Sequence, residues 1–210
     1  MLAKERIINQ IIEGEGFKSY LEIGIAGASC FDRIGCEKRQ GVEPSEEMLA
    51  DLQERGYGDM ELIFQGTSDE FFAQNDKKKK EKERFYLIFI DGLHHADQVE
   101  KDIVNAWYAL NEGGVILLHD VHPPTEAHQV VPREQLSWTG DVWKSFVGFR
   151  QKYPKIPTGC FREKYGLGWI KKVPRTKVEP GFALEEDWSY FLGNFDNGKL
   201  LGYDQNFKSE

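Results

Sequence analysis

All five histidines of this 210-residue chain fall between residues 94 and 128, and Asp91 and Asp120 stand beside them. His94 and His95 follow Asp91 within four residues, while His119 directly precedes Asp120. Histidine titrates near neutral pH, so it can take a proton from a hydroxyl group as the oxygen attacks. This segment is the most informative local feature of the sequence.

Two interpretations of the histidines follow from the residues alone. His94 or His95, with Asp120 close by, could act as a general base in catalysis. Alternatively, the histidines hydrogen-bond loop backbones and only shape the rim of a site. For any single histidine the two interpretations stay open, and for the group we favour a functional role.

Apolar segments that could position these residues alternate along the chain between two periodicities. Predicted strands cover residues 20–25, a segment ending at 41–43, and residues 62–64, 85–90, 115–118, 156–161 and 167–170. Predicted helices cover residues 2–13, a segment opened by 44–47, a segment opened by 67–70, a segment reaching 113–114, and residues 141–151. Residues 121–140 hold three prolines and are predicted to form a long loop.

Alternation of strands with helices is typical of a parallel sheet. We therefore expect an α/β fold: a Rossmann-like, seven-stranded, mostly parallel sheet with helices on both faces. The last two strands are expected to pair antiparallel. In such sheets, ligands bind beyond the carboxyl ends of the strands.

Small or polar residues lie at the carboxyl ends of the first five predicted strands. They are Glu22, Gly24, Ala26 and Gly27 after the first strand, Glu43 after the second, Thr67 and Ser68 after the third, Asp91 after the fourth, and His119 and Asp120 after the fifth. The small residues let a ligand approach the backbone. Glu43 lies 21 positions after Glu22, a spacing that suits an acid binding both hydroxyls of a ribose.

Five segments together resemble the class I S-adenosylmethionine-dependent methyltransferases, and more narrowly a bacterial family of small O-methyltransferase-like proteins. They are Leu21–Ser29, Gly41–Ser45, Phe89–His95, Leu110–Asp120 and Gly140–Trp143, within a resemblance spanning about residues 18–172. The resemblance concerns fold and cofactor, and it says little about the molecule that accepts the methyl group.

The resemblance implies a role for each residue at the strand ends. Glu22, Gly24, Ala26 and Gly27 would line the methionine and ribose part of S-adenosylmethionine, Glu43 would bind the ribose, Thr67 and Ser68 would lie near the adenine, and Asp91 would lie below the sulfonium. The cofactor carries positive charge on sulfur and on its amino group, so a carboxylate there is favourable. The implied acceptor is a small hydroxylated molecule such as a sugar.

The resemblance also raises a third interpretation of the histidine segment, a divalent metal site. Related O-methyltransferases hold an ion between acids that follow the fourth and fifth strands, where this chain has Asp91 and Asp120. Val121 stands where such enzymes have Asp or Asn, which argues against magnesium. His94 or His122 could shift the preference toward a softer ion.

Composition limits the partners. The net charge of −8 disfavours nucleic acid, and no apolar run is long enough to span a membrane. The start of the chain has no apolar signal segment, so we expect a cytoplasmic protein. Three cysteines without paired spacing indicate neither disulfides nor a thiolate zinc site. The basic run at residues 77–80 is predicted to be a solvated, mobile loop rather than a binding patch.

We expect a cofactor-binding domain over residues 1–173 and an aromatic-rich extension over residues 174–210, which packs on the domain or mediates a homodimer. Two other functions stay open. A nicotinamide-dependent oxidoreductase would want a G-x-G-x-x-G sequence, and here Ala26 replaces the middle glycine. A non-catalytic protein could keep the same fold.

Overall fold

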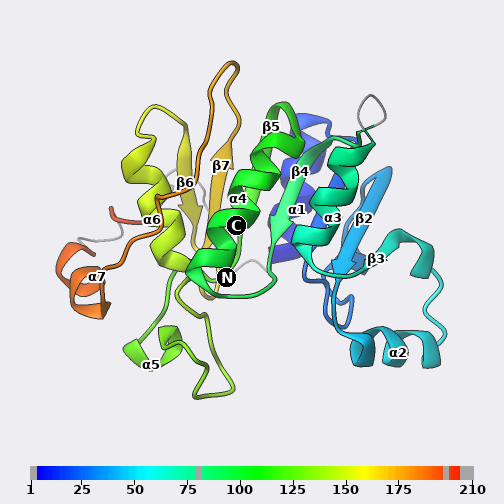
Figure 1. Ribbon diagram of the computed structural model, residues 1–210, viewed down its shortest axis with the longest axis horizontal. Helices are drawn as coiled ribbons and strands as arrows, with labels where there is room; N and C mark the ends of the chain where they lie inside the picture. Colours follow the sequence, from blue (N-terminus) through cyan, green and yellow to red (C-terminus); the bar gives the residue numbers. More distant parts are fainter. Residues whose placement is uncertain (1–3, 79–81, 196–198, 204–210) are drawn as a thin grey trace.

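Seven strands form one sheet in the computed structural model of the protein, which describes residues 4–78, 82–195 and 199–203. The strands are β1 (Ser19–Ile23), β2 (Lys38–Glu43), β3 (Ile63–Gln65), β4 (Phe85–Ile90), β5 (Leu110–Leu118), β6 (Thr158–Phe161) and β7 (Leu167–Lys171). Their order across the sheet is β3-β2-β1-β4-β5-β7-β6 (Figure 1). The predicted seven-stranded α/β fold is confirmed.

The first five strands are parallel, and β7 and β6 run antiparallel to their neighbours, as predicted. Strand β1 lies in the middle, where Leu21 is opposite Gln40 on β2 and Ile88 on β4. All five residues of β1 are buried. A strand covered on both faces favours apolar side chains, and the two polar residues of β1, Ser19 and Glu22, accept hydrogen bonds from the Tyr86 N–H and the Tyr20 hydroxyl.

Helices cover both faces of the sheet. They are α1 (Lys4–Glu15), α2 (Glu46–Glu54), α3 (Ser68–Lys77), α4 (Ala96–Ala109), α5 (Glu126–Gln129), α6 (Val142–Lys152) and α7 (Trp188–Asn194), with short 3-10 helices at Phe31–Arg33 and Met60–Leu62. Helices α3, α4 and α6 share one apolar core with Leu21, and in Figure 1 they lie in front of the sheet. Helices α1 and α2 share a second core with Tyr20 on the opposite face.

The end of α4 differs from the prediction. The helix was expected to reach residues 113–114, but it ends at Ala109. Leu110 has an extended backbone and is opposite Phe85 as the first residue of β5. The buried Lys172 donates from Nζ to two carbonyl oxygens at this junction, at 2.8 Å each. Contacts with distant strands thus end the helix, before the glycines that would otherwise have ended it.

Other boundaries shift by a few residues. The predicted helix 2–13 continues to Glu15 and stops at Gly16, which has a φ of 68°, while residue 2 lies outside the described residues. The strand predicted from residue 156 begins at Thr158, because Ile156 packs in the core ahead of it. The predicted loop 121–140 contains the single turn of α5.

The segment after β7 packs on the core formed by α4 and α6. Its buried side chains include Val178, Phe182, Phe191 and Leu201. Tyr203 bridges Cys160 at the outer strand β6. Residues 204–210, including Phe207, lie outside the described residues. The division into a domain and an extension, and the homodimer, stay predictions.

The basic run is only partly described. Lys77 ends α3, and Lys78 pairs with Glu83 at 2.7 Å. Lys82 pairs with Asp76. Residues 79–81 lie outside the described residues, so the predicted loop conformation cannot be compared there. No described helix combines the length and the apolar character needed to cross a membrane.

Candidate active site

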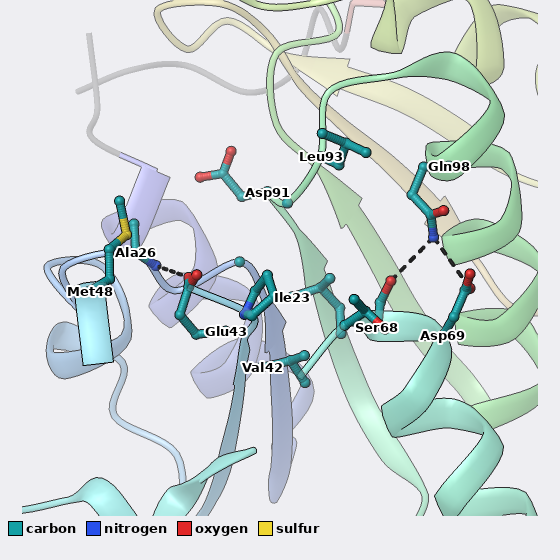
Figure 2. A pocket seen from close by; sticks show the side chains of 14 residues that line it. Ile23, Ala26, Val42, Glu43, Met48, Ser68, Asp69, Asp91, Leu93 and Gln98 are labelled. Carbon is teal, nitrogen blue, oxygen red and sulfur yellow. Dashed lines mark hydrogen bonds between the residues drawn. The ribbon is translucent and has the colours of Figure 1, made fainter. Parts of the chain in front are cut away.

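A cavity of about 440 Å³ opens at the carboxyl ends of β1, β2 and β4 (Figure 2). Six of the eight predicted cofactor residues line it: Gly24, Ala26, Glu43, Thr67, Ser68 and Asp91. The other lining residues are Ile23, Val42, Pro44, Met48, Asp69, Gly92, Leu93 and Gln98. The edge of the sheet that the sequence indicated is therefore hollowed, and most of the predicted residues meet there.

The loop after β1 brings backbone to the floor of this cavity. Gly24 has a φ of 83°, and a Cβ atom placed on it would lie 2.4 Å from the carbonyl oxygen of Asp91. Ala26 and Ala28 also have positive φ, at 47° and 59°. A residue other than glycine could not bring β1 and β4 this close at position 24.

Glu43 fixes that loop to the start of α2. Its Oε2 accepts a hydrogen bond from the Ala26 backbone N–H at 2.8 Å (Figure 2). Its Oε1 accepts one from the Ser45 N–H at 2.9 Å. The Glu43 side chain is buried, yet it borders the cavity. Because each carboxylate oxygen can accept two hydrogen bonds, Glu43 retains acceptor capacity for a ligand.

The beginning of α3 forms the opposite wall. Thr67 caps the helix and exchanges hydrogen bonds with Glu70 in a capping box, and Ser68 is the first helical residue. Gln98 on α4 donates to Ser68 Oγ and Asp69 Oδ1 at 3.3 Å each (Figure 2). This places a polar amide and a carboxylate beside the predicted adenine end.

Glu22 and Gly27 are the two predicted cofactor residues that do not line the cavity. Side chains alternate along a strand, so Glu22 points to the α1 face together with Tyr20. It accepts a hydrogen bond from the Tyr20 hydroxyl at 2.5 Å. Burial raises the pKa of Glu22 to about 8, so this carboxyl is mostly protonated at neutral pH.

A cluster of charged side chains surrounds Asp91 where β4 and β5 end. Asp91 Oδ1 lies 3.1 Å from His119 Nδ1 and 3.4 Å from His94 Nε2, and Oδ2 accepts a hydrogen bond from Lys4. His94 Nδ1 lies 3.3 Å from Asp120 Oδ2. Asp120 adopts a φ of 61°, a conformation that aspartate tolerates better than most residues.

The charges in this cluster are mutually stabilised. Burial alone would lower the pKa of His119, but Asp91, together with Glu163 at 3.1 Å and Asp120, raises it to about 10. Burial alone would raise the pKa of Asp91, but His119, His94 and Lys4 hold it well below its usual range. Burial raises the pKa of Asp120 to about 6. The cluster therefore contains cations that balance its carboxylates.

The predicted metal site can be compared with this geometry. Donor atoms of Asp91, His94 and Asp120 lie within 4.8 Å of one another, close enough to share an ion. However, Asp91 already faces the Lys4 ammonium and the protonated His119, and Val121 supplies no further oxygen ligand. Adding a divalent ion would place it against two positive charges. These residues do not fit a divalent metal.

A family model described as a methyltransferase domain matches residues 21–121 of the chain. This stretch contains most of β1, the whole of β2 to β5, and all of the residues that line the cavity. Residues 21–121 are a methyltransferase domain. The resemblance to methyltransferases that was stated from the sequence is confirmed.

Solved structures share the fold of this methyltransferase at low sequence identity. An O-methyltransferase from Bacillus cereus, in complex with S-adenosylhomocysteine (SAH), is 16% identical over 80% of this chain and 79% of its own, with a TM-score of 0.59. The SAH-bound methyltransferase PaMTH1 from Podospora anserina is 17% identical over 82% and 80%, with a TM-score of 0.58. At these identities the likeness establishes the fold alone.

A third structure and one negative search complete the comparison. The O-methyltransferase TomG from Streptomyces achromogenes, involved in tomaymycin synthesis and in complex with S-adenosylmethionine, is 14% identical over 81% of this chain and 79% of its own, with a TM-score of 0.55. A search among curated protein sequences gives no match.

The remaining histidines of the methyltransferase lie outside the charged cluster. His95 precedes α4, and its ring faces the edge of Trp138. His122 contacts the Tyr203 hydroxyl through Nδ1, and His128 lies 2.8 Å from the Thr125 hydroxyl. Of the predicted bases, His94 lies nearest to Asp91, whereas the role of His95 stays a prediction without a contact to the cluster.

Two tryptophans near the end of the loop before α6 differ in position. Trp138 stacks on His94, with ring centroids 5.6 Å apart, so it borders the charged cluster. Trp143 is fully buried in the core and packs against Phe191, with its indole N–H donating to Gln129. Trp143 is therefore part of the core rather than of the cluster's border.

Several residues of the site lacked a sequence signal. Lys4 comes from α1, Gln98 from α4 and Glu163 from the turn between β6 and β7. None belongs to a motif that follows a parallel strand. Met48 and Asp69 had a weak signal, because each lies in the first turn of a helix that follows a predicted strand end.

Below the cavity, Asp102 provides a test of the site's electrostatics. Burial raises the pKa of Asp102 to about 6, although Ser68 and Gln98 hydrogen-bond to it. The unfolded chain, with a pKa near 3.8, loses this proton first. The stabilising contribution of protonated Asp102 is thus fully present below about pH 4 and is lost as the pH rises through about 6.

We expect Asp102→Asn to remove this loss. The difference in free energy of unfolding between Asp102→Asn and the native protein should grow by up to about 3 kcal/mol from about pH 4 to pH 7, since two pKa units correspond to roughly that energy. Urea denaturation across this pH range measures it. The exposed Asp97, on the same helix, gives the control Asp97→Asn, which should show no such trend. A pH-independent difference for Asp102→Asn would contradict the prediction.

Proposed function

We propose that this methyltransferase transfers the methyl group of S-adenosylmethionine to a hydroxyl oxygen of a small acceptor. The observation that carries the proposal is the position of Asp91, which borders the cofactor cavity on one side and the His94–Asp120 pair on the other. A cofactor in the cavity and an acceptor at the histidines would therefore meet at this carboxylate.

The residues have distinct tasks in this proposal. Glu43 and the backbone after β1 bind the ribose, and the Ser68–Gln98 wall faces the adenine. When bound, S-adenosylmethionine supplies a methyl group on a positively charged sulfur. His94 takes the proton of the acceptor hydroxyl, and Asp120 beside it stabilises the charge that His94 gains. Positioning of the two partners supplies most of the rate enhancement.

The acceptor is proposed to be a hydroxylated small molecule such as a sugar. The support comes from the sequence resemblance, and the names of two structural neighbours as O-methyltransferases agree with transfer to oxygen. Trp138, stacked on His94, offers an aromatic face to such a molecule. Incubation of the enzyme and labelled cofactor with a panel of sugars and phenols would identify the class.

Binding of two cofactors to the purified protein tests the proposal against an oxidoreductase. We expect calorimetry to show one site for S-adenosylmethionine with micromolar affinity and no heat with NAD. The loop after β1 has Ala26 in place of the glycine that a pyrophosphate would approach. Added magnesium should leave the affinity unchanged. Binding heat with NAD, together with no binding heat with S-adenosylmethionine, would overturn the proposal.

A further inference from the structure

Lys4 reaches the charged cluster from a part of the chain that no cofactor motif includes. It is the first described residue of α1, and its Nζ donates a hydrogen bond to Asp91 Oδ2. The ammonium also lies 5.4 Å from the centroid of the Phe89 ring. Its side chain retains 24% exposure, so the group lies at the edge of the site and not in the core.

The two oxygens of Asp91 face different cations. Oδ1 faces the imidazoles of His119 and His94, at 3.1 and 3.4 Å, whereas Oδ2 faces Lys4. Of these three groups, Lys4 has the longest and most flexible side chain, and it is the most exposed to solvent. Glu22 also faces α1, but it is mostly protonated at neutral pH and carries little charge. Asp91 is therefore the carboxylate that the Lys4 ammonium neutralises on the α1 side.

This arrangement resembles a metal site in its parts. Two carboxylates and an imidazole converge within 4.8 Å, as ligands of a divalent ion do. Yet the oxygen of Asp91 that points toward α1 is already taken by an ammonium. A divalent ion bound at Asp91 would have to displace Lys4 or tolerate its charge at short range.

We propose that Lys4 is a built-in cation of the active site, which takes the place of a divalent metal at Asp91. This inference rests on the proposed function, because it concerns the charge that the cofactor and acceptor meet. The Lys4 ammonium supplies the positive charge at Asp91, so the methyltransferase needs no divalent ion there. Besides the N–H that donates to Asp91, the Lys4 ammonium has two further N–H donors.

Manganese binding, followed by electron paramagnetic resonance of free Mn²⁺, tests the proposal without an acceptor. We expect Lys4→Met to raise the affinity for Mn²⁺ at least about tenfold, because removal of the ammonium exposes the Asp91 carboxylate. Lys4→Arg keeps the charge and should bind Mn²⁺ as weakly as the native protein. Lys18→Met is the matched control, since Lys18 is an exposed lysine next to the opposite end of β1.

Each outcome has a definite meaning. A Mn²⁺ affinity that Lys4→Met leaves unchanged overturns the proposal, whether that affinity is high or low. Tight stoichiometric binding by the native protein also overturns it. Thermal unfolding shows whether each variant is folded, and Lys4→Gln replaces Lys4→Met if the latter is not. Cofactor titration is a separate measurement, so failure of the proposed function would appear there and not in Mn²⁺ binding.

Discussion

Glu43→Gln is expected to weaken the binding of S-adenosylmethionine by at least about a hundredfold. The bonds lost are the charge-assisted hydrogen bonds that Glu43 is proposed to accept from the two ribose hydroxyls, at about 1.5 kcal/mol or more each. Both carboxylate oxygens of Glu43 already accept backbone N–H groups, from Ala26 and Ser45. An amide in place of the carboxylate loses the negative charge and one acceptor oxygen. It therefore weakens the ribose contact and loosens the loop that forms the cavity floor.

Calorimetric titration of the native protein and of Glu43→Gln measures this effect. Glu47→Gln is the matched control, because Glu47 is an exposed glutamate four residues further along, in the first turn of α2. It should leave the dissociation constant within about twofold, as expected for an exposed surface charge. Equal affinities for the native protein and Glu43→Gln would show that the ribose is bound elsewhere.

Gly24→Ala is expected to destabilise the protein by several kcal/mol, on the order of 3 or more, and to abolish cofactor binding. The added Cβ would lie 2.4 Å from the Asp91 carbonyl oxygen and 2.6 Å from the Gly92 Cα, and both are backbone atoms of the turn that follows β4. Gly24 also has a φ of 83°, which alanine adopts only with strain. To relieve the clash, β1 and β4 would have to separate at the cavity.

Gly27→Ala, in the same loop, is the comparison for this prediction. A Cβ there meets only the end of the Arg55 side chain at 4.0 Å, and Gly27 has no positive φ. We expect it to change the free energy of unfolding by less than about 1 kcal/mol. Thermal and urea denaturation of both variants measure the difference. Equal stability of the two variants would refute the close approach of Gly24 to β4.

The parts of the site that follow parallel strands could be predicted from the sequence. Glu43, Asp91 and Asp120 each stand at or just beyond the carboxyl end of a predicted strand, and topology alone brings such positions to one edge. The order of strands and helices was readable for the same reason, because the periodicity changes at each boundary. Those residues needed no knowledge of side-chain packing.

The parts contributed by other elements could not be predicted. Lys4 and Asp91 are 87 positions apart, and their contact depends on how α1 lies across the sheet. The early end of α4 depends on Lys172, which follows the last strand. The orientation of Glu22 depends on which side of β1 faces α1. Each of these features depends on how distant segments pack together, and a local sequence pattern does not determine that.

Strand β5 lies in the interior of the sheet only because β7 pairs with its outer edge, at Val115 to Leu118. During synthesis, about fifty residues separate the two strands, and the ribosome adds residues one after another. Until β7 emerges, β5 is an unpaired edge with an apolar sequence, which is a template for association with other chains. A nascent chain stopped before residue 167 would therefore be the most aggregation-prone species of this protein. The exposed strand would be the one that leads directly into His119 and Asp120.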